Sequence, residues 1–291
     1  MENQAMQNIL SDLKANGFMQ QKQEGFFSMR LHSVGGQFTA EQLGAIQKVA
    51  EQFGKGYIHL TSRQGIEIPF IHFKDIDAVK KTLAEGNARV GVCGARVRTI
   101  TACQGNAVCA SGLIDTTRIA NEIEKRVGGR NLPHKFKIGL TGCRNNCLKT
   151  EENDLGIKGA VVPNWKSSFC IFCGRCVAKC PVHAIKIDRR EKSWEIDRDV
   201  CVNCGRCIRA CESNAIDGEH GFSLSFGGRY GNQIRIGQKF PSIVFGEENL
   251  FEIIEQTLKF FEAHGKKKER FSSTLERIGW DVFKKEILEQ N

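Results

Sequence analysis

Long hydrophobic runs are missing from this sequence of 291 residues. No uninterrupted apolar stretch approaches the roughly 20 residues that a transmembrane helix needs, so we expect no membrane span. The first residues, MENQA, also lack the basic region and the apolar core with which a secretory signal begins. We therefore expect a cytoplasmic protein whose thiols are kept out of disulfides.

Two nucleotide-binding patterns are absent as well. Neither G-x-G-x-x-G nor G-x-x-x-x-G-K-[ST] occurs, which leaves the chain without a recognisable site for NAD(P)H or ATP. The net charge is +9, from 42 Lys and Arg against 33 Asp and Glu, but the basic residues are scattered and are not interleaved with aromatic ones. We therefore expect no nucleic-acid partner, and a patch for anionic ligands fits the charge equally well. The run Lys266-Lys267-Lys268 is expected to be a solvated loop.

Cysteine is what the chain has in abundance: there are thirteen, and twelve of them form three sets of four. Two sets share the spacing C-x2-C-x2-C-x3-C that is typical of bacterial ferredoxins. They are Cys170, Cys173, Cys176 and Cys180 (the first run), and Cys201, Cys204, Cys207 and Cys211 (the second run). Zinc is the competing interpretation, but two tandem copies of the full run disfavour it.

In two-cluster ferredoxins the last cysteine of each run binds the other cluster. We therefore expect Cys211 to complete the first-run cluster and Cys180 to complete the second-run cluster, each of them 4Fe-4S. The second run is followed by Glu212 where Pro181 follows the first, a change that leaves every ligand in place.

An internal repeat contains both runs. Residues 172–185 are echoed 31 residues later by residues 203–216, which predicts an inserted two-cluster ferredoxin module over residues 166–217. The remaining boundaries divide the chain into a half-domain at 1–86 and a larger domain in two parts, 87–165 and 218–291. We expect an α+β fold in which the module interrupts this mixed α/β domain.

Local patterns predict the elements of these domains. The half-domain has strands at 27–33, 57–61 and 66–70, a helix that begins at the capping-box sequence of residues 39–42 and ends at Gly54, and a second helix at 75–83. His59, on the second of these strands, is expected to be packed. Beyond residue 87 the expected elements are a helix at 114–127, a strand at 135–140, β sequence at 221–245 and helices at 248–263 and 272–288.

The third set of cysteines has a different spacing, Cys103-x5-Cys109 and then Cys143-x3-Cys147. The stretches RTITACQGNAVC, residues 98–109, and GCRNNC, residues 142–147, resemble the sirohaem and 4Fe-4S signature of sulfite and nitrite reductases. Further segments resemble that family in order along nearly the whole chain; they are Met29-Arg30 before Gly35-Gly36, Leu60-Thr-Ser-Arg63-Gln64, Pro133-His-Lys135-Phe-Lys137 and Gly227-Gly-Arg-Tyr-Gly231. With a ferredoxin module before the last segment, the layout is similar to dissimilatory sulfite reductase subunits and to the small subunit of anaerobic sulfite reductase.

The resemblance implies a ferredoxin-like fold for the half-domain and a sirohaem and 4Fe-4S domain around the third set. It implies that Cys103, Cys109, Cys143 and Cys147 bind a third 4Fe-4S cluster, and that Cys147 also bridges to the sirohaem iron. It further implies that Arg30, Arg98, Lys135 and Lys137 hold sulfite and relay protons, whereas Arg63, Arg229 and the Gly227-Gly228 pair lie nearer the sirohaem. Taken singly, each Arg or Lys is more often a solvated surface residue, and the glycine pair is compatible with a simple turn.

Two observations bear on these basic residues and on the remaining thiol. Lys135 and Lys137 alternate on the expected strand and so share a face, which favours a joint role. Cys93 belongs to no set and is expected to be a buried or half-buried free thiol.

The resulting hypothesis is an enzyme that reduces sulfite to sulfide with six electrons, which arrive through the ferredoxin module. Nitrite reduction to ammonia with the same cofactors is the close alternative, and a non-catalytic iron-sulfur electron-transfer protein is the third. A separate electron donor is expected, either ferredoxin or a partner subunit with flavin. Larger family members contain two copies of the half-domain arrangement and this chain has one, so we expect a homodimer or a hetero-oligomer.

Overall fold

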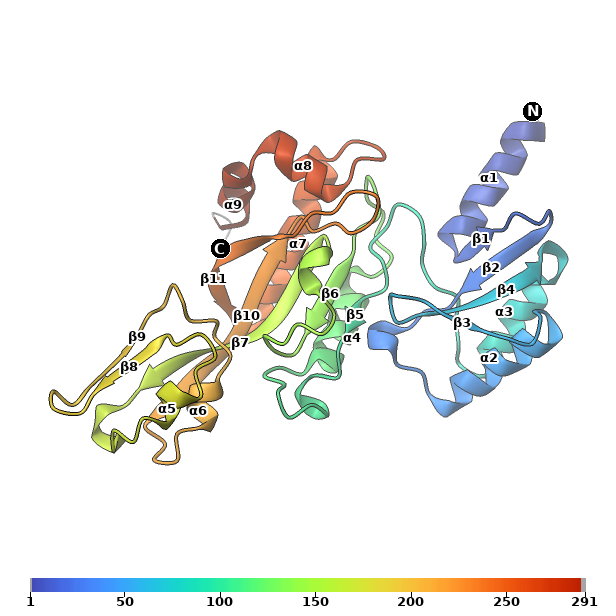
Figure 1. Cartoon of the computed structure of the whole chain (residues 1–291). Helices are drawn as coiled ribbons and strands as arrows, with labels where there is room; N and C mark the ends of the chain where they lie inside the picture. The colour runs from blue at the N-terminus through green and yellow to red at the C-terminus, as the bar shows by residue number, and fades with distance from the viewer. Residues whose placement is uncertain (1, 289–291) are drawn as a thin grey trace.

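The computed structural model describes residues 2–288, which form three parts arranged in a row (Figure 1). The N-terminal half-domain lies at one end, a central domain in the middle, and residues 166–217 at the other end. Residues 218–288 return to the central domain, so the segment at the far end is an insertion. Within the described residues no helix is long and apolar enough to cross a membrane.

A four-stranded sheet with the order β1-β2-β4-β3 is the framework of the half-domain. Its elements are α1 Glu2–Ala15, β1 Phe18–Gln20, β2 Phe26–Arg30, α2 Ala40–Gln52, β3 His59–Leu60, β4 Ile66–His72 and α3 Ile76–Glu85. The capping box begins α2 as expected, because Thr39 and Gln42 each accept a hydrogen bond from the other's backbone N–H. Ile46 and Val49 of that helix are buried in the core of the half-domain.

A five-stranded sheet with the order β11-β10-β7-β6-β5 is the framework of the central domain. Its strands are β5 Thr101–Ala102, β6 Ile138–Thr141, β7 Leu155–Trp165, β10 Ile216–Phe226 and β11 Gln238–Phe245, and its helices are α4 Thr116–Val127, α7 Glu247–His264, α8 Phe271–Ile278 and α9 Trp280–Leu288. The strands β5, β6 and β7 are parallel, whereas β10 and β11 run antiparallel to their neighbours. Buried aliphatic and aromatic side chains of the sheet and the helices form one large core.

The inserted segment is small and has its own apolar cluster. It contains α5 Arg175–Ala178, the hairpin of β8 Ile185–Asp188 and β9 Ser193–Ile196, and α6 Arg206–Arg209. Cys176, Trp194 and Cys207 are buried in its cluster together with aliphatic neighbours. The segment extends from the far ends of β7 and β10, which pair along their whole length (Figure 1). Short 3-10 helices complete the described chain; they are η1 Val34–Gly36, η2 Phe73–Asp75, η3 Gly105–Ala107, η4 Thr150–Glu152 and η5 Ser167–Phe169.

The structure corrects several local expectations. The strand expected at 135–140 begins only at Ile138, and the helix expected at 272–288 is divided at Gly279, whose φ of 109° ends α8. The expectation that His59 is packed is wrong, because its side chain is exposed on the edge strand β3. Sequence analysis did not predict α1 or β1.

Candidate active site

The third set of cysteines is assembled at the carboxyl ends of two neighbouring strands. Cys103 directly follows β5 and Cys143 closely follows β6, and these strands are parallel partners. Parallel neighbours end at the same edge of a sheet, so the two cysteine pairs are brought together although they are far apart in sequence. Cys109 and Cys147 complete the set on the exposed side.

A backbone N–H donates to the sulfur of Cys103. The N–H of Gly142 donates to Cys103 Sγ at 3.0 Å, and the N–H of Leu113 donates to the carbonyl of Gly142 at 2.7 Å. Burial raises the pKa of the Cys143 thiol, and the neighbouring sulfurs of the set raise it further. Four grouped cysteine thiols are a suitable donor set for an iron-sulfur core, which binds them as thiolates.

A cavity of about 260 Å³ lies between the half-domain and the central domain. Five basic side chains line it: Arg30, Arg63, Arg98, Lys135 and Lys137. No Asp or Glu is among the described residues that line this cavity. It is therefore an anion site by composition, since its cations have no acidic neighbour on the cavity wall.

Arg30 and Arg98 meet on either side of Cys93. Arg30 lies opposite Glu67 on β4 and donates from Nε to that carboxylate, while its Nη1 lies 3.8 Å from Cys93 Sγ. Burial lowers the pKa of Arg30, but Glu67 and Cys93 more than offset that effect. Burial also lowers the pKa of Arg98, whose Nε is buried without a hydrogen-bond partner. A buried donor without a partner is available to an anionic ligand.

Lys135 and Lys137 flank a core residue. Phe136 is fully buried, and its N–H and C=O bond to the backbone of Arg96 and Arg98 at 3.0 and 2.8 Å. The chain is therefore extended here, so both lysines reach the cavity while Phe136 points into the core. The shared face of the two lysines is present although β6 begins one residue later.

A second cavity of about 450 Å³ adjoins the first, because Ser62, Arg63 and Lys137 line both. Cys147 lines this second cavity, as does the exposed Tyr230 from the loop before β11. The two cavities thus place the third cysteine set next to the cluster of cations.

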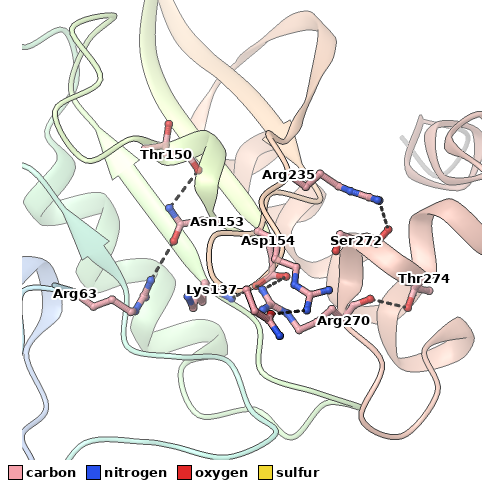
Figure 2. Close-up of polar contacts among 11 residues, drawn as sticks. Arg63, Lys137, Thr150, Asn153, Asp154, Arg235, Arg270, Ser272 and Thr274 are labelled. Atoms are coloured by element: carbon pink, nitrogen blue, oxygen red, sulfur yellow. Dashed lines mark hydrogen bonds and ion pairs between the residues drawn. The ribbon is translucent and has the colours of Figure 1, made fainter. Parts of the chain in front are cut away.

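Arg63 and Lys137, which line both cavities, are held by Asn153 and Asp154 (Figure 2). Arg63 donates from Nη1 to Asn153 Oδ1 at 3.0 Å, and Asn153 Nδ2 donates to the carbonyl of Thr150 at 3.2 Å. Asp154 accepts from the backbone N–H of Lys137 at 2.9 Å and from Arg270 Nη2 at 3.0 Å. Because Arg270 directly precedes α8, this buried network ties the cavity wall to the C-terminal helices.

The electrostatics of this network are set by burial. Burial lowers the pKa of Lys137 to about 8, with the nearby Arg63 and Arg270 acting in the same direction and Asp154 opposing them. Burial likewise lowers the pKa of Arg63 to about 10, and Arg98 adds to that shift. Burial raises the pKa of the Asp154 carboxyl, and the Arg270 guanidinium opposes that effect.

In the glycine-rich segment, residues 227–231, Tyr230 lines the second cavity, whereas Gly227, Gly228 and Arg229 line neither cavity. Gly228 packs against the backbone carbonyls of Glu151 and Asn153, and Gly227 adopts a φ of 78° next to Leu275. Arg229 is half-buried and forms a backbone bridge with Arg235. The pKa of Lys135 is lowered mainly by burial, then by the positive charges of Arg270 and Arg98, and last by that of Arg229. The structure therefore places Arg229 near the cation cluster, whereas both glycines have packing contacts of their own.

The two ferredoxin-type runs are interleaved at the far end of the molecule. A small enclosed space is lined by four cysteines together, Cys180 from the first run and Cys201, Cys204 and Cys207 from the second. Burial raises the pKa of the Cys207 thiol to about 12, and Cys201 and Cys204 act in the same direction. This grouping has the composition of the crossed ligand set of a two-cluster ferredoxin.

All thirteen cysteines are free thiols. Among residues 2–288, no group of three His, Cys, Asp or Glu side chains converges on a single metal ion. A larger cavity of about 1240 Å³ shares Ser33 with the first one and is lined by both Glu124 and Lys125, so it lacks the uniform charge of the smaller cavity.

The sequence matches two family descriptions in chain order. The nitrite/sulfite reductase ferredoxin-like half domain matches residues 19–86, and the nitrite and sulphite reductase 4Fe-4S domain matches residues 93–291. The chain belongs to the nitrite and sulfite reductase family. The family resemblance and the mixed α+β fold expected from the sequence are both confirmed.

Relatives in this family include two sulfite reductases. The coenzyme F420-dependent sulfite reductase of Methanocaldococcus jannaschii is 33% identical over 276 residues, which cover 94% of this chain and 44% of that protein. The matching chain of the anaerobic sulfite reductase of Salmonella typhimurium is 32% identical over 192 residues, which cover 61% of this chain and 56% of that relative. The chain thus spans about half the length of these relatives.

The fold also resembles a solved structure of the family. Dissimilatory sulfite reductase I superposes with a TM-score of 0.72 over 90% of this chain and 69% of that chain, at 20% sequence identity. At that identity the likeness concerns the fold alone.

Sequence analysis missed several residues of this site. Asn153, Asp154 and Arg270 hold the cavity wall, and Tyr230 lines the cavity of Cys147. Cys93, expected only to be a buried or half-buried thiol, is buried and lies between two of the cations that line the first cavity. Tyr230 lies in the glycine-rich segment, residues 227–231, but received no role there, whereas no local motif marks Asn153, Asp154 or Arg270, and Asp154 and Arg270 are 116 positions apart.

Proposed function

We propose that this protein reduces sulfite to sulfide, using a sirohaem coupled to a 4Fe-4S cluster. The observation that carries the proposal is the cavity lined by Arg30, Arg63, Arg98, Lys135 and Lys137, which adjoins the cavity of Cys147. Sulfite is a small anion whose oxygens leave as water, so it needs both positive charge and protons. Basic side chains with no acidic neighbour on the cavity wall supply the first need.

The residues present fit the implied cofactors. Cys103, Cys109, Cys143 and Cys147 are grouped free thiols with a backbone donor to one sulfur, as a 4Fe-4S cluster requires. Arg63 and Arg229 are the candidates for holding the carboxylates of sirohaem, with Gly227 and Gly228 shaping the loop behind them. When bound, the coupled pair supplies the electrons and the iron centre for the reduction.

The side chains of the cavity have separable tasks. Arg98, with its unpartnered Nε, and Arg30 bind the anion and orient it. Lys137 is the best placed proton donor, because a pKa of about 8 lets it both hold and release a proton near neutral pH. Lys135 shares this face and adds positive charge.

Electrons are proposed to arrive through residues 166–217, on two further 4Fe-4S clusters bound by the first and second runs. The name of the Methanocaldococcus jannaschii relative states that it depends on coenzyme F420, and this chain corresponds to about half of that protein's length. We therefore infer that a ferredoxin or a flavin-containing partner provides the electrons. A second copy or a partner subunit is proposed to supply the missing half-domain.

Turnover with a reduced viologen dye tests the proposal. Anaerobically purified wild-type protein is expected to oxidise the dye when sulfite is added and to release sulfide. Arg98→Ala is expected to raise the KM for sulfite, while the matched surface variant Arg118→Ala, which lies outside the cavity, is expected to behave as the wild type.

The same assay discriminates the alternatives. Faster turnover of nitrite, with ammonia as the product, would favour the nitrite reductase interpretation. Rapid reduction of the protein by the dye with turnover of neither anion would leave only the electron-transfer interpretation.

A further inference from the structure

The two ferredoxin-type runs are near-copies in sequence, yet they lie in different surroundings. Each run places a left-handed glycine before its short helix, Gly174 with φ 82° before α5 and Gly205 with φ 69° before α6. Cys173 and Cys204, which precede these glycines, occupy equivalent positions in the repeat. The pair therefore allows a like-for-like comparison within one molecule.

The second-run loop is seated on the central domain. The N–H of Val161 on β7 donates to the carbonyl of Asn203 at 3.0 Å, and Val161 forms a backbone bridge with Cys204. A methyl group on Gly205 would lie 2.6 Å from Val161 Cγ1 and 3.5 Å from Leu113 Cδ2. A side chain at position 205 therefore has no room against the central domain.

The second run also contacts the segment that follows Cys109 of the third cysteine set. Arg209 Nη1 donates to the carbonyl of Ala110 at 3.4 Å, and Ala110 directly follows Cys109. His220 Nδ1 lies 3.0 Å from the carbonyl of Leu113 on the same segment. The first run has Ala178 where the second has Arg209, so this contact has no counterpart there.

The first-run loop faces away from the central domain. A methyl group on Gly174 would meet nothing within 4 Å. Cys173 is exposed, and the neighbouring Phe169 and Ile171 are 59% and 70% exposed. Phe172 of this loop accepts a hydrogen bond at its carbonyl from Arg189 Nε of the same segment at 3.2 Å, and its ring contacts Trp165 at the end of β7.

We infer that the second run, completed by Cys180, exchanges electrons with the Cys103, Cys109, Cys143 and Cys147 set, and that the first run is the distal one. The inference rests on the proposed function in that it requires clusters on all three sets. One electron passes at a time from the second run, which is oxidised, to the third set, which is reduced, and no bond is made or broken. Electron tunnelling slows steeply with distance. The second-run loop, which packs on the central domain, is therefore favoured as the electron donor to the third set over the first-run loop, which faces away from it.

Electron paramagnetic resonance of the dithionite-reduced holoprotein tests this order. Cys204→Ser and Cys173→Ser should each alter one cluster signal, which assigns the signals to the two runs. In the wild type the second-run signal should saturate at higher microwave power than the first-run signal, because the nearby third-set cluster speeds its relaxation. Faster relaxation of the first-run signal, or equal relaxation of both, would overturn the inference.

Gly205→Ala and Gly174→Ala form a matched pair that keeps every cysteine. Both place a side chain on a left-handed glycine, but only the first adds a clash with Val161. Gly205→Ala should lose part of the relaxation enhancement and Gly174→Ala should keep it; loss in Gly174→Ala alone would contradict the assignment. If Gly205→Ala does not load its clusters, Arg209→Ala provides the same comparison from an exposed position. Arg209→Ala should lose part of the relaxation enhancement of the second-run signal. An unchanged enhancement in this variant would count against the inference.

The outcomes separate this inference from the proposed function. A protein that shows the expected relaxation pattern but reduces neither sulfite nor nitrite supports the order of the runs and contradicts the enzyme. A wild-type protein without any cluster signal contradicts both.

Discussion

The proposed chemistry of this site depends on individual basic side chains, and Lys137 is the one whose pKa is lowered to about 8. It lines both cavities, and Asp154 fixes its backbone while opposing the effect of burial on its pKa. Lysine is strongly hydrated in water and changes its pKa readily when it is buried. The surroundings of Lys137 therefore bring the pKa of this proposed proton donor toward neutral pH.

Activity should fall as the pH rises through about 8, because Lys137 then loses its proton. Lys137→Arg keeps the charge and should move this alkaline limb to higher pH, and Lys137→Ala should lower kcat on the order of a hundredfold. Asp154→Asn removes a charge that raises the Lys137 pKa, so it should move the limb to lower pH. The pH profile of kcat/KM is the measurement, and a limb that stays in place in all three variants contradicts the assignment.

The ion pair of Asp154 and Arg270 is a buried one, with side-chain exposures of 0% and 9%. Arg270→Ala should destabilise the fold by about 3–5 kcal/mol, because it leaves a carboxylate buried without its partner. Arg118→Ala removes the exposed pair with Glu247 and should cost about 1 kcal/mol or less. Chemical denaturation of both variants measures the difference, and equal losses would show that the buried pair is not a structural anchor.

At the scale of elements, sequence periodicity and capping predicted most of what was found. The capping box correctly placed the start of α2 after its N-cap Thr39, and the strand expected near residues 135–140 is present as β6, whereas its parallel partner β5 was not predicted. The break at Gly279 and the exposure of His59 on β3 were not predictable, because they depend on tertiary packing. The link from Lys137 through Asp154 to Arg270 was missed for the same reason: Asp154 and Arg270 are 116 positions apart and no local pattern joins them.

The glycine-rich segment provides a test at this scale. A methyl group on Gly228 would overlap the backbone carbonyls of Glu151 and Asn153, whereas one on Gly231 meets nothing within 4 Å. Gly228→Ala should therefore destabilise the fold by about 1–3 kcal/mol, and Gly231→Ala should change stability far less. Thermal unfolding compares the two, and equal melting temperatures would contradict the close approach.

The whole molecule consists of three parts arranged in a row. The half-domain and the central domain form the walls of the cation cavity, the third cysteine set lies at the end of the parallel strands, and the inserted segment extends away on β7 and β10 (Figure 1). Family membership fixes the fold of this arrangement. The proposed chemistry depends on whether the two cofactors meet at Cys147.

The absorption spectrum of the anaerobically purified protein tests that claim most directly. The account predicts reduced-porphyrin bands of sirohaem together with iron and sulfide, and it predicts that Cys147→Ser removes the coupling between haem and cluster while leaving the two ferredoxin-type runs loaded. A wild-type protein that contains iron and sulfide without sirohaem bands, or a Cys147→Ser variant with unchanged spectrum and turnover, would contradict it.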